Sequence, residues 1–335
     1  MRKLLAVAVL ALVAAGCGAG HARTAKQCAQ PPEIDSGFKT DFCRHVVPLL
    51  QFQAGGPGKD GIPALNRPDF APASSIRWLS PREPVIELAL GREVRAYPLQ
   101  ILIWHEIVND RLAGTPVAVT FCPLCNTAIA FDRRVGGRTL SFGTTGNLRN
   151  SDLVMYDRQT ESWWQQFGGA ALVGRYAGTR LRQLPARIVA WREFARRHPH
   201  GLVLTRNTGF SRPYGQNPYA GYDDVSSPPF LGAAHGGDHR LQPKERVVFL
   251  ERGRDAAAVP FSALQRTQVV RVTIGHHHLV VRWRGGVASA LDSGSIPSGR
   301  DVGAATVTES GRLVVFDEPF WFAVAAFRPN VRVVR

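Results

Sequence analysis

An internal repeat is the feature of this sequence that most constrains its fold. Residues 79–102 read LSPREPVIELALGREVRAYPLQIL, and residues 241–264 read LQPKERVVFLERGRDAAAVPFSAL, at a constant offset of 162 without a gap. Ten of the 24 positions are identical. Agreement at that level exceeds chance, so we infer that a module has been duplicated.

Each copy has the pattern of a β-hairpin followed by a short helix. A strand at residues 85–89 or 247–250 reaches a Gly-Arg turn, returns as a second strand, and meets a proline that starts the helix, Pro98 or Pro260. Further strands are expected after each helix. The sequence therefore predicts a β-rich α+β fold of mainly antiparallel sheets with short helices, built around two copies of a hairpin-helix-strand module.

The N-terminus predicts export. Met1-Arg2-Lys3 precedes an apolar run over residues 4–15 that is too short to span a bilayer. Ala14-Ala15-Gly16-Cys17 resembles the lipobox of bacterial lipoproteins. The resemblance implies a signal peptide over residues 1–16 and a lipid on Cys17 that anchors an extracytoplasmic protein to the cell membrane. The alternative, an ordinary secretory signal in which Cys17 has no role, also exports the chain.

The remaining chain divides into three predicted parts. Residues 17–60 form the tether and an N-terminal arm, residues 61–235 the first module with the candidate site, and residues 236–335 a second module packed against the first. Cys28 and Cys43 lie in the arm, and we expect a disulfide between them that stabilises it by roughly 3 kcal/mol. Metal ligation by this pair is the alternative.

The charge pattern bears on the partners of the chain. The formal net charge is +15, and the basic residues are spread along the sequence without a dense block. A nucleic-acid partner is therefore not expected, because a binding face needs clustered charge. The expected partners are the membrane, through the lipid on Cys17, and an unidentified small molecule or cell-envelope ligand.

The motif Cys122-Pro-Leu-Cys125 lies between two expected strands, residues 117–121 and 127–132. Such a turn directs both sulfurs to one side and suits a tetrahedral metal. Asn126 suits the left-handed conformation that often follows the second cysteine. Three interpretations stay open: part of a metal site, a couple for thiol-disulfide exchange, and a structural disulfide. A thioredoxin fold is disfavoured, because the residues after Cys125 alternate like a hairpin and do not form a long helix.

His105 and Glu106 lie near the end of the helix that starts at Pro98, shortly before the strand that leads to Cys122. We expect His105 to complete a metal site with the two cysteines, holding zinc or copper with one position open, and Glu106 to act as an acid/base or to support the ligands. The segment differs from the H-E-x-x-H zinc motif, because Asn109 replaces the second histidine. In the structural alternative, His105 only interacts with the helix terminus and Glu106 is solvated.

The second copy of the repeat serves as an internal control. It carries the Gly-Arg turn and the proline, but not the cysteines or the His-Glu pair. Residues needed for folding should be present in both copies, whereas residues that perform chemistry need be in only one. The contrast favours a functional role for the special residues of the first copy.

A tyrosine-rich segment is a further candidate for function. Residues 205–224, TRNTGFSRPYGQNPYAGYDD, predict a long ordered loop, and loops of this length often carry function. Tyr214, Tyr219 and Tyr222 in this loop, together with Asp152 beyond the cysteine hairpin, are candidates to line a pocket.

Several long segments resemble one family. YPLQILIWHEIVND, VTFCPLCNTAIAFDR, NSDLVMYDRQTESWW, TGFSRPYGQNPYAGYD and FWFAVAAFRP together resemble the bacterial domain of unknown function 3179, over about residues 61–329. The resemblance implies an exported or membrane-attached globular domain and supplies no reaction, cofactor or catalytic residue. Members of the family usually carry glycine after C-P-L-C, where this chain has Asn126.

The function expected from the sequence is that of an exported lipoprotein with a Cys/His metal site in its first module. Two alternatives remain. One is thiol-disulfide exchange through Cys122 and Cys125, and the other is a non-enzymatic module that presents the tyrosine-rich loop to a cell-envelope ligand. Whether the protein is an enzyme is left open by the sequence.

Overall fold

The computed structural model describes residue 28, residues 37–234 and residues 238–335. The expected signal peptide and Cys17 lie outside the described residues. Cys28 and Cys43 are joined by a disulfide, with Cα atoms 5.2 Å apart. None of the helices in the described ranges has the length and apolar character needed to cross a membrane.

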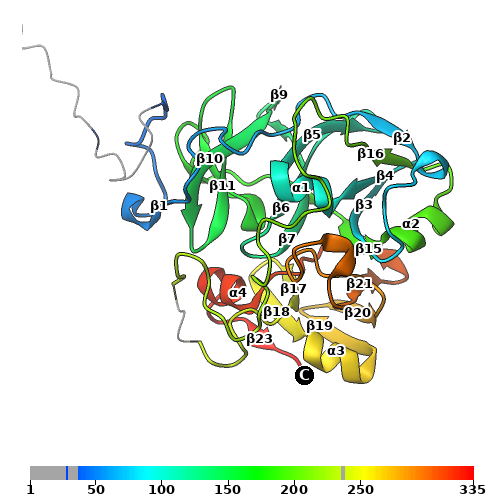
Figure 1. Cartoon of the computed structure of the whole chain (residues 1–335). Helices are drawn as coiled ribbons and strands as arrows, with labels where there is room; N and C mark the ends of the chain where they lie inside the picture. Colours follow the sequence, from blue (N-terminus) through cyan, green and yellow to red (C-terminus); the bar gives the residue numbers. More distant parts are fainter. Residues whose placement is uncertain (1–27, 29–36, 235–237) are drawn as a thin grey trace, which may run out of the picture.

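Nearly all strands of the described chain belong to five sheets of three to five strands, whose arrangement resembles a five-bladed β-propeller (Figure 1). In order across each sheet, sheet 1 contains β1 (Gln53–Ala54), β10 (Phe142–Arg149), β11 (Asp152–Asp157), β12 (Trp163–Gln165) and β13 (Ala171–Val173). Sheet 2 contains β14 (Arg182–Leu184), β7 (Thr127–Asp132), β6 (Thr115–Cys122) and β5 (Ile107–Leu112).

The other three principal sheets are mainly antiparallel. Sheet 3 contains β15 (Ala186–Ala190), β3 (Pro84–Leu90), β4 (Glu93–Pro98), β16 (Leu202–Leu204) and β2 (Phe70–Pro72). Sheet 4 contains β17 (Val247–Arg252), β18 (Asp255–Pro260) and β23 (Arg332–Val333), and sheet 5 contains β19 (Val269–Ile274), β20 (His277–Arg284), β21 (Ala304–Glu309) and β22 (Arg312–Leu313). A small hairpin joins β8 (Arg134–Val135) to β9 (Arg138–Thr139). Two strand pairs are parallel, β4 with β16 and β18 with β23.

The helices of the described chain are short. The α-helices have seven residues each and are α1 (Leu99–His105), α2 (Trp191–Arg197), α3 (Phe261–Thr267) and α4 (Trp321–Phe327). Single 3-10 turns are η1 (Leu49–Gln51), η2 (Ala73–Ser75), η3 (Phe167–Gly169) and η4 (Ile296–Ser298). The predicted β-rich class of mainly antiparallel sheets and short helices is confirmed.

The prediction that the whole fold is built around two modules is wrong, and the sheets explain why. Each copy of the repeat supplies hairpins to two different sheets: β3–β4 and β5–β6 enter sheets 3 and 2, whereas β17–β18 and β19–β20 enter sheets 4 and 5. Sheet 1 lies outside the repeat. Each of the two copies thus contributes strands to two sheets, and sheet 1 is the fifth. The result is a five-sheet arrangement and not a pair of modules.

The repeat is nevertheless visible locally. Helices α1 and α3 begin and end at positions 162 residues apart, and each follows a proline whose backbone is extended. Both helices end in a residue with positive φ, Glu106 at 55° and Gln268 at 60°, whose N–H donates to the carbonyl of the fourth residue before it. In both copies the second hairpin strand has a parallel partner that follows another seven-residue helix.

The predicted boundary near residue 235 stays a prediction. Sheets 1 to 3 use strands that end before residue 205, and sheets 4 and 5 use strands that begin after residue 246. The largest buried cluster, however, contains residues from both sides, among them Leu124, Ile129, Leu291 and Phe320. The two parts therefore share a core.

Trp163 anchors the N-terminal arm to sheet 1. Its fully buried ring makes T-shaped contacts with the rings of Phe38, Phe42 and Phe52, whose centroids lie 5.2 to 5.4 Å from that of Trp163. These perpendicular contacts add to the burial of apolar area. Residues 38–52 of the arm are thus part of the folded body.

We expect Trp163→Ala to lower the free energy of unfolding by about 3 to 5 kcal/mol, because it leaves a large cavity between the arm and sheet 1. Urea denaturation would measure the change. Leu50→Ala is the matched control, since Leu50 is 78% exposed and its truncation should leave stability nearly unchanged. A loss below about 1 kcal/mol for the tryptophan variant would contradict the packing described.

Candidate functional site

The two cysteines of the C-P-L-C turn lie together with one carboxylate. Ligand atoms of Cys122, Cys125 and Asp152 all lie within 4.8 Å of one another, and the three side chains are at most 1% exposed. Both cysteines are free thiols. Ligand atoms around one tetrahedral ion lie roughly 3.5 to 4 Å apart for bonds of about 2.0 to 2.3 Å. Small shifts would let these three groups hold a single metal ion.

The hairpin of sheet 2 positions the cysteines. Cys122 is the last residue of β6 and pairs with Thr127, the first residue of β7, so the turn between them is closed by the ladder. Asn126 has φ of 56°, the left-handed conformation predicted for it. Its side-chain amide donates to the carbonyl of Glu318 at 2.8 Å, and the N–H of Phe320 donates to the carbonyl of Cys125 at 2.9 Å. The segment before α4 therefore holds the turn in place.

Sheet 1 supplies Asp152 through a tight hairpin. Asn150 and Ser151, between β10 and β11, both have positive φ, which is the backbone of a type I′ turn. Asp152 is the first residue of β11, and its Oδ1 accepts a hydrogen bond from the Cys125 thiol at 2.8 Å. Its Oδ2 accepts from the side chain of Gln165 and from the N–H of Phe167. The carboxylate is thus fixed in orientation on both sides.

A second set of hydrogen bonds fixes Thr127, which contacts the Cys125 sulfur. The Cys125 Sγ lies 2.9 Å from the Thr127 hydroxyl, which donates to Gln166 Oε1 at 2.6 Å. Gln166 in turn donates to the Thr120 hydroxyl and to the Thr127 carbonyl. Hydrogen bonds of this kind around a ligand fix its rotamer and are typical of protein metal sites.

Burial dominates the acid-base chemistry of the site. It raises the pKa of Asp152 to about 6 and that of Glu106 to about 8, and the charge of Asp152 adds to the rise at Glu106. Burial also raises the pKa of the Cys122 thiol and raises that of Cys125 well above its ordinary value. Four acidic groups therefore share a region that disfavours negative charge, so each retains its proton to higher pH unless a cation compensates.

Glu106 reaches the site from the end of α1. Its positive φ of 55° recurs at Gln268 in the second copy of the repeat, so the unusual backbone belongs to the scaffold and not to the chemistry. The side chains differ: Glu106 is a buried carboxyl, whereas Gln268 is an exposed amide. An ionisable group has thus been placed on a backbone position that both copies share.

A cavity of about 560 Å³ is lined by Glu106 and by Leu124 and Leu153, the sequence neighbours of Cys125 and Asp152. Its walls are mostly apolar and include Leu124, Leu153, Tyr219 and Tyr222, with Glu106 and Lys244 among the polar groups. The Lys244 ammonium lies 3.4 Å from the centre of the Tyr222 ring and donates to the Tyr222 carbonyl at 2.7 Å. Burial lowers the pKa of Lys244 to about 8.

The tyrosine-rich loop has the form predicted for it, but only part of it borders this cavity. No helix or strand interrupts the described residues between β16 and β17. Tyr219 and Tyr222 line the cavity, whereas Tyr214 does not and is hydrogen-bonded to His105 instead. Asp152, also expected at a pocket wall, lies in the cysteine cluster.

The structure corrects the expected place of His105. Its Nδ1 lies 2.7 Å from the Pro63 carbonyl and its Nε2 2.7 Å from the Tyr214 hydroxyl. Because a carbonyl can only accept, Nδ1 carries the proton and Nε2 accepts from Tyr214, which in turn accepts from Thr208. Both ring nitrogens are engaged, and His105 is not in the cluster formed by the cysteines.

Asn109, which takes the place of the second histidine in the H-E-x-x-H comparison, has a structural role. It lies in β5, and its amide exchanges two hydrogen bonds with the backbone of Phe142, at 2.8 and 2.9 Å. These bonds join sheet 2 to sheet 1 where the strand ladders do not. A zinc site of the H-E-x-x-H type is therefore excluded here, because the segment continues as a strand and not as a helix.

Sequence reasoning missed three contributors to this site. Gln165 and Gln166 hold Asp152 and Thr127, and Lys244 lies against Tyr222. The two glutamines follow the Trp163-Trp164 pair, where polar residues in an otherwise buried strand were a usable signal. Lys244 offered none, because it occurs in an ordinary polar stretch before β17.

The chain belongs to the family described as Protein of unknown function (DUF3179), whose family model matches residues 59–331. The family suggested by the sequence is thereby confirmed. No curated protein and no solved structure shows a significant match to the chain.

The raised pKa values at Glu106 and Asp152 predict how the stability of the metal-free protein depends on pH. Because the folded state holds these protons more tightly than the unfolded state, stability should fall as pH rises from about 4.5 toward 8, by roughly 1.4 kcal/mol for each unit of pKa difference. Asp317 and Glu318, whose pKa values burial raises to about 7, share the slope below pH 7, so Glu106→Gln should remove most of the slope only between pH 7 and 8. Urea denaturation at several pH values measures it.

Glu93→Gln is the control for this test, since the Glu93 side chain is 53% exposed. It should follow the wild type at every pH. If the free energy of unfolding has the same pH dependence in wild type and in Glu106→Gln, burial does not disfavour ionisation of Glu106.

Proposed function

We propose that this protein is an exported lipoprotein that binds one divalent zinc or copper ion through Cys122, Cys125 and Asp152, with one coordination position open toward the cavity beside Glu106. The observation that carries the proposal is the cluster itself: two thiols from one copy of the repeat and a carboxylate from sheet 1, all buried and within 4.8 Å of one another. Buried acidic groups without a cation are costly, and a bound metal compensates their charge.

The donor set suits zinc and copper better than magnesium or calcium. Two thiolates are soft ligands, and hard cations are bound by oxygen alone. In the metal-free state, the proton of the Cys125 thiol lies between sulfur and Asp152 Oδ1. Metal binding would replace this proton and that of Cys122, so uptake of the ion should release protons and weaken as pH falls.

Three protein ligands leave room for a further ligand. The cavity lined by Tyr219 and Tyr222 is large enough for a small organic molecule, and Glu106 borders it with a carboxyl whose pKa is about 8. A group with that pKa can give or take a proton near neutral pH. These features favour an open site, which presents the metal to a ligand. They do not favour a closed structural site, in which four protein ligands surround the ion.

Thiol-disulfide exchange is supported less well by the same residues. An exchanging cysteine needs an accessible thiolate, and reactive cysteines have lowered pKa values. Here Cys122 and Cys125 are 1% and 0% exposed, and burial raises the pKa of both thiols. A module that binds a cell-envelope ligand without metal remains the other candidate, supported by the cavity next to the tyrosine-rich loop.

We expect protein purified from a periplasmic or secreted expression to contain about one zinc or copper ion per chain. Cys122→Ser and Asp152→Asn should each reduce this content to below about a tenth, because each removes one of three protein ligands. Elemental analysis by mass spectrometry, with thermal denaturation to check folding, provides the measurement.

His105→Ala is the matched control, since both nitrogens of His105 are bound elsewhere. The His105→Ala variant should retain the metal. If this variant loses the metal, His105 is a metal ligand after all. A metal content that Cys122→Ser leaves unchanged would refute the site. If the protein is also free of metal and its Cys122/Cys125 couple has a reduction potential above roughly −250 mV, thiol exchange replaces the proposal.

The anchor is tested separately. In a bacterial host that processes lipoproteins, the chain should fractionate with membranes and incorporate labelled fatty acid, because the lipobox directs a lipid to Cys17. Cys17→Ala should abolish the label and release the protein from the membrane fraction. Export without any label would support the ordinary secretory signal instead.

A further inference from the structure

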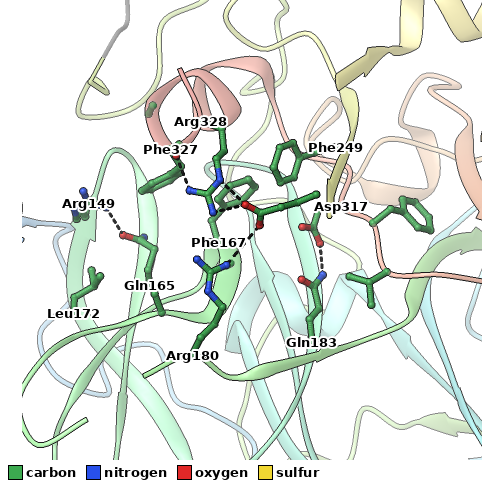
Figure 2. Close-up of a pocket in the computed structure, with 16 residues that line it drawn as sticks. Arg149, Gln165, Phe167, Leu172, Arg180, Gln183, Phe249, Asp317, Phe327 and Arg328 are labelled. Atoms are coloured by element: carbon green, nitrogen blue, oxygen red, sulfur yellow. Dashed lines mark hydrogen bonds and ion pairs between the residues drawn. The ribbon is translucent and has the colours of Figure 1, made fainter. Parts of the chain in front are cut away.

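A second pocket, of about 250 Å³, lies where sheets 1, 2 and 4 meet α4 (Figure 2). In Figure 2, Arg328 reaches the pocket from above and Arg180 from below, Arg149 lies at the left beside Gln165 with Phe327 between it and Arg328, and Phe249 lies at the right. The pocket shares no lining residue with the cavity beside Glu106, although β10 contributes residues to both.

The charge in this pocket is unevenly compensated. Glu251 accepts from Arg328 at 2.6 Å and lies 3.6 Å from Arg180, so one carboxylate serves two guanidinium groups. Asp317 is the other acid, and burial raises its pKa to about 7, so part of it is neutral near pH 7. Three guanidinium groups thus face two carboxyl groups, and that of Asp317 is only partly ionised.

Arg149 is the cation with the least compensation. Its Nε donates to Gln51 Oε1 at 2.7 Å and its Nη1 to Gln165 Oε1 at 3.2 Å, and both acceptors are neutral amides. The ion pairs found among the described residues do not include it. Burial lowers its pKa, which is the effect of removing a cation from water without a paired carboxylate.

The remaining walls of the pocket are aromatic. Phe167 and Phe327 are stacked with ring centroids 5.2 Å apart, and Phe167 also packs against Phe249 at 5.3 Å. The Arg149 guanidinium lies 5.4 Å from the centre of the Phe327 ring. A ligand that contacts both the guanidinium groups and the phenylalanine rings has an anionic end and a flat apolar body.

We propose that this pocket binds a small organic carboxylate, with the carboxylate between Arg149 and Arg180 and an aromatic or other apolar body against the phenylalanine rings. Guanidinium groups suit this role, since their planar array of N–H donors matches a carboxylate. The inference does not depend on the metal site.

Benzoate is the probe, and isothermal titration calorimetry of the purified full chain measures its binding. We expect saturable binding that is about tenfold weaker for benzamide, which keeps the ring but lacks the charge, and for acetate, which keeps the charge but lacks the ring. Arg149→Gln and Arg180→Gln should each weaken benzoate about tenfold, whereas Glu251→Gln should strengthen it by freeing Arg180 and Arg328.

Arg138→Gln is the matched control, because it makes the same charge change at an exposed residue of β9. It should leave benzoate binding unchanged, and thermal denaturation of every variant would check folding. Cys122→Ser should also leave it unchanged, so the carboxylate site and the metal site can fail independently.

Three results would overturn the proposal. They are the absence of saturable binding of benzoate and of its longer analogue phenylacetate, equal affinity for benzoate in Arg149→Gln and wild type, and inorganic phosphate binding as tightly as benzoate. The last would mean that the pocket recognises charge alone and not an organic carboxylate.

Discussion

The contact between the Cys125 thiol and Asp152 is the constraint on which the rest of the candidate site depends. It joins sheet 2 to sheet 1 at 2.8 Å, and neither side chain has any exposed surface. Burying two acidic groups together is unfavourable unless each has partners. The structure supplies them for Asp152, which accepts from Gln165 and the Phe167 N–H in addition to the Cys125 thiol. The elements around the cluster therefore have to close together for the contact to exist.

The site lies where the repeated and unrepeated parts of the fold meet. Cys122, Cys125 and Glu106 belong to the first copy of the repeat, whereas Asp152 and Gln165 come from sheet 1, which the repeat does not build. Glu106 and Gln268 show how the two copies diverged, since they keep the same backbone but differ in charge and burial. Duplication thus provided a scaffold, and packing against sheet 1 made one of its two copies distinctive.

The cysteine cluster adjoins two hollows of different character. On the Glu106 side the walls are tyrosine, leucine and proline. The arginine-lined pocket is joined to the cluster through Gln165, which accepts from Arg149 and donates to Asp152. The negative charge of Asp152 in turn favours the charged form of Arg149. Acidic groups that have to be buried are in this way placed near a positive potential, which lowers the cost of ionising them.

The sequence by itself determined the local features of this protein: the strands on both sides of the cysteines, the short helices after Pro98 and Pro260, the left-handed Asn126, and the long loop before β17. Each depends on residues a few positions apart, whose backbone preferences can be read from their type. The tertiary structure alone decided the five-sheet arrangement and the residues that meet. Asp152 reaches a cysteine 27 positions away, and His105, which is nearer to Cys122 in sequence, turns to Pro63 and Tyr214. Which side chains share a buried volume is set by the packing of whole sheets, and no single stretch of sequence contains that information.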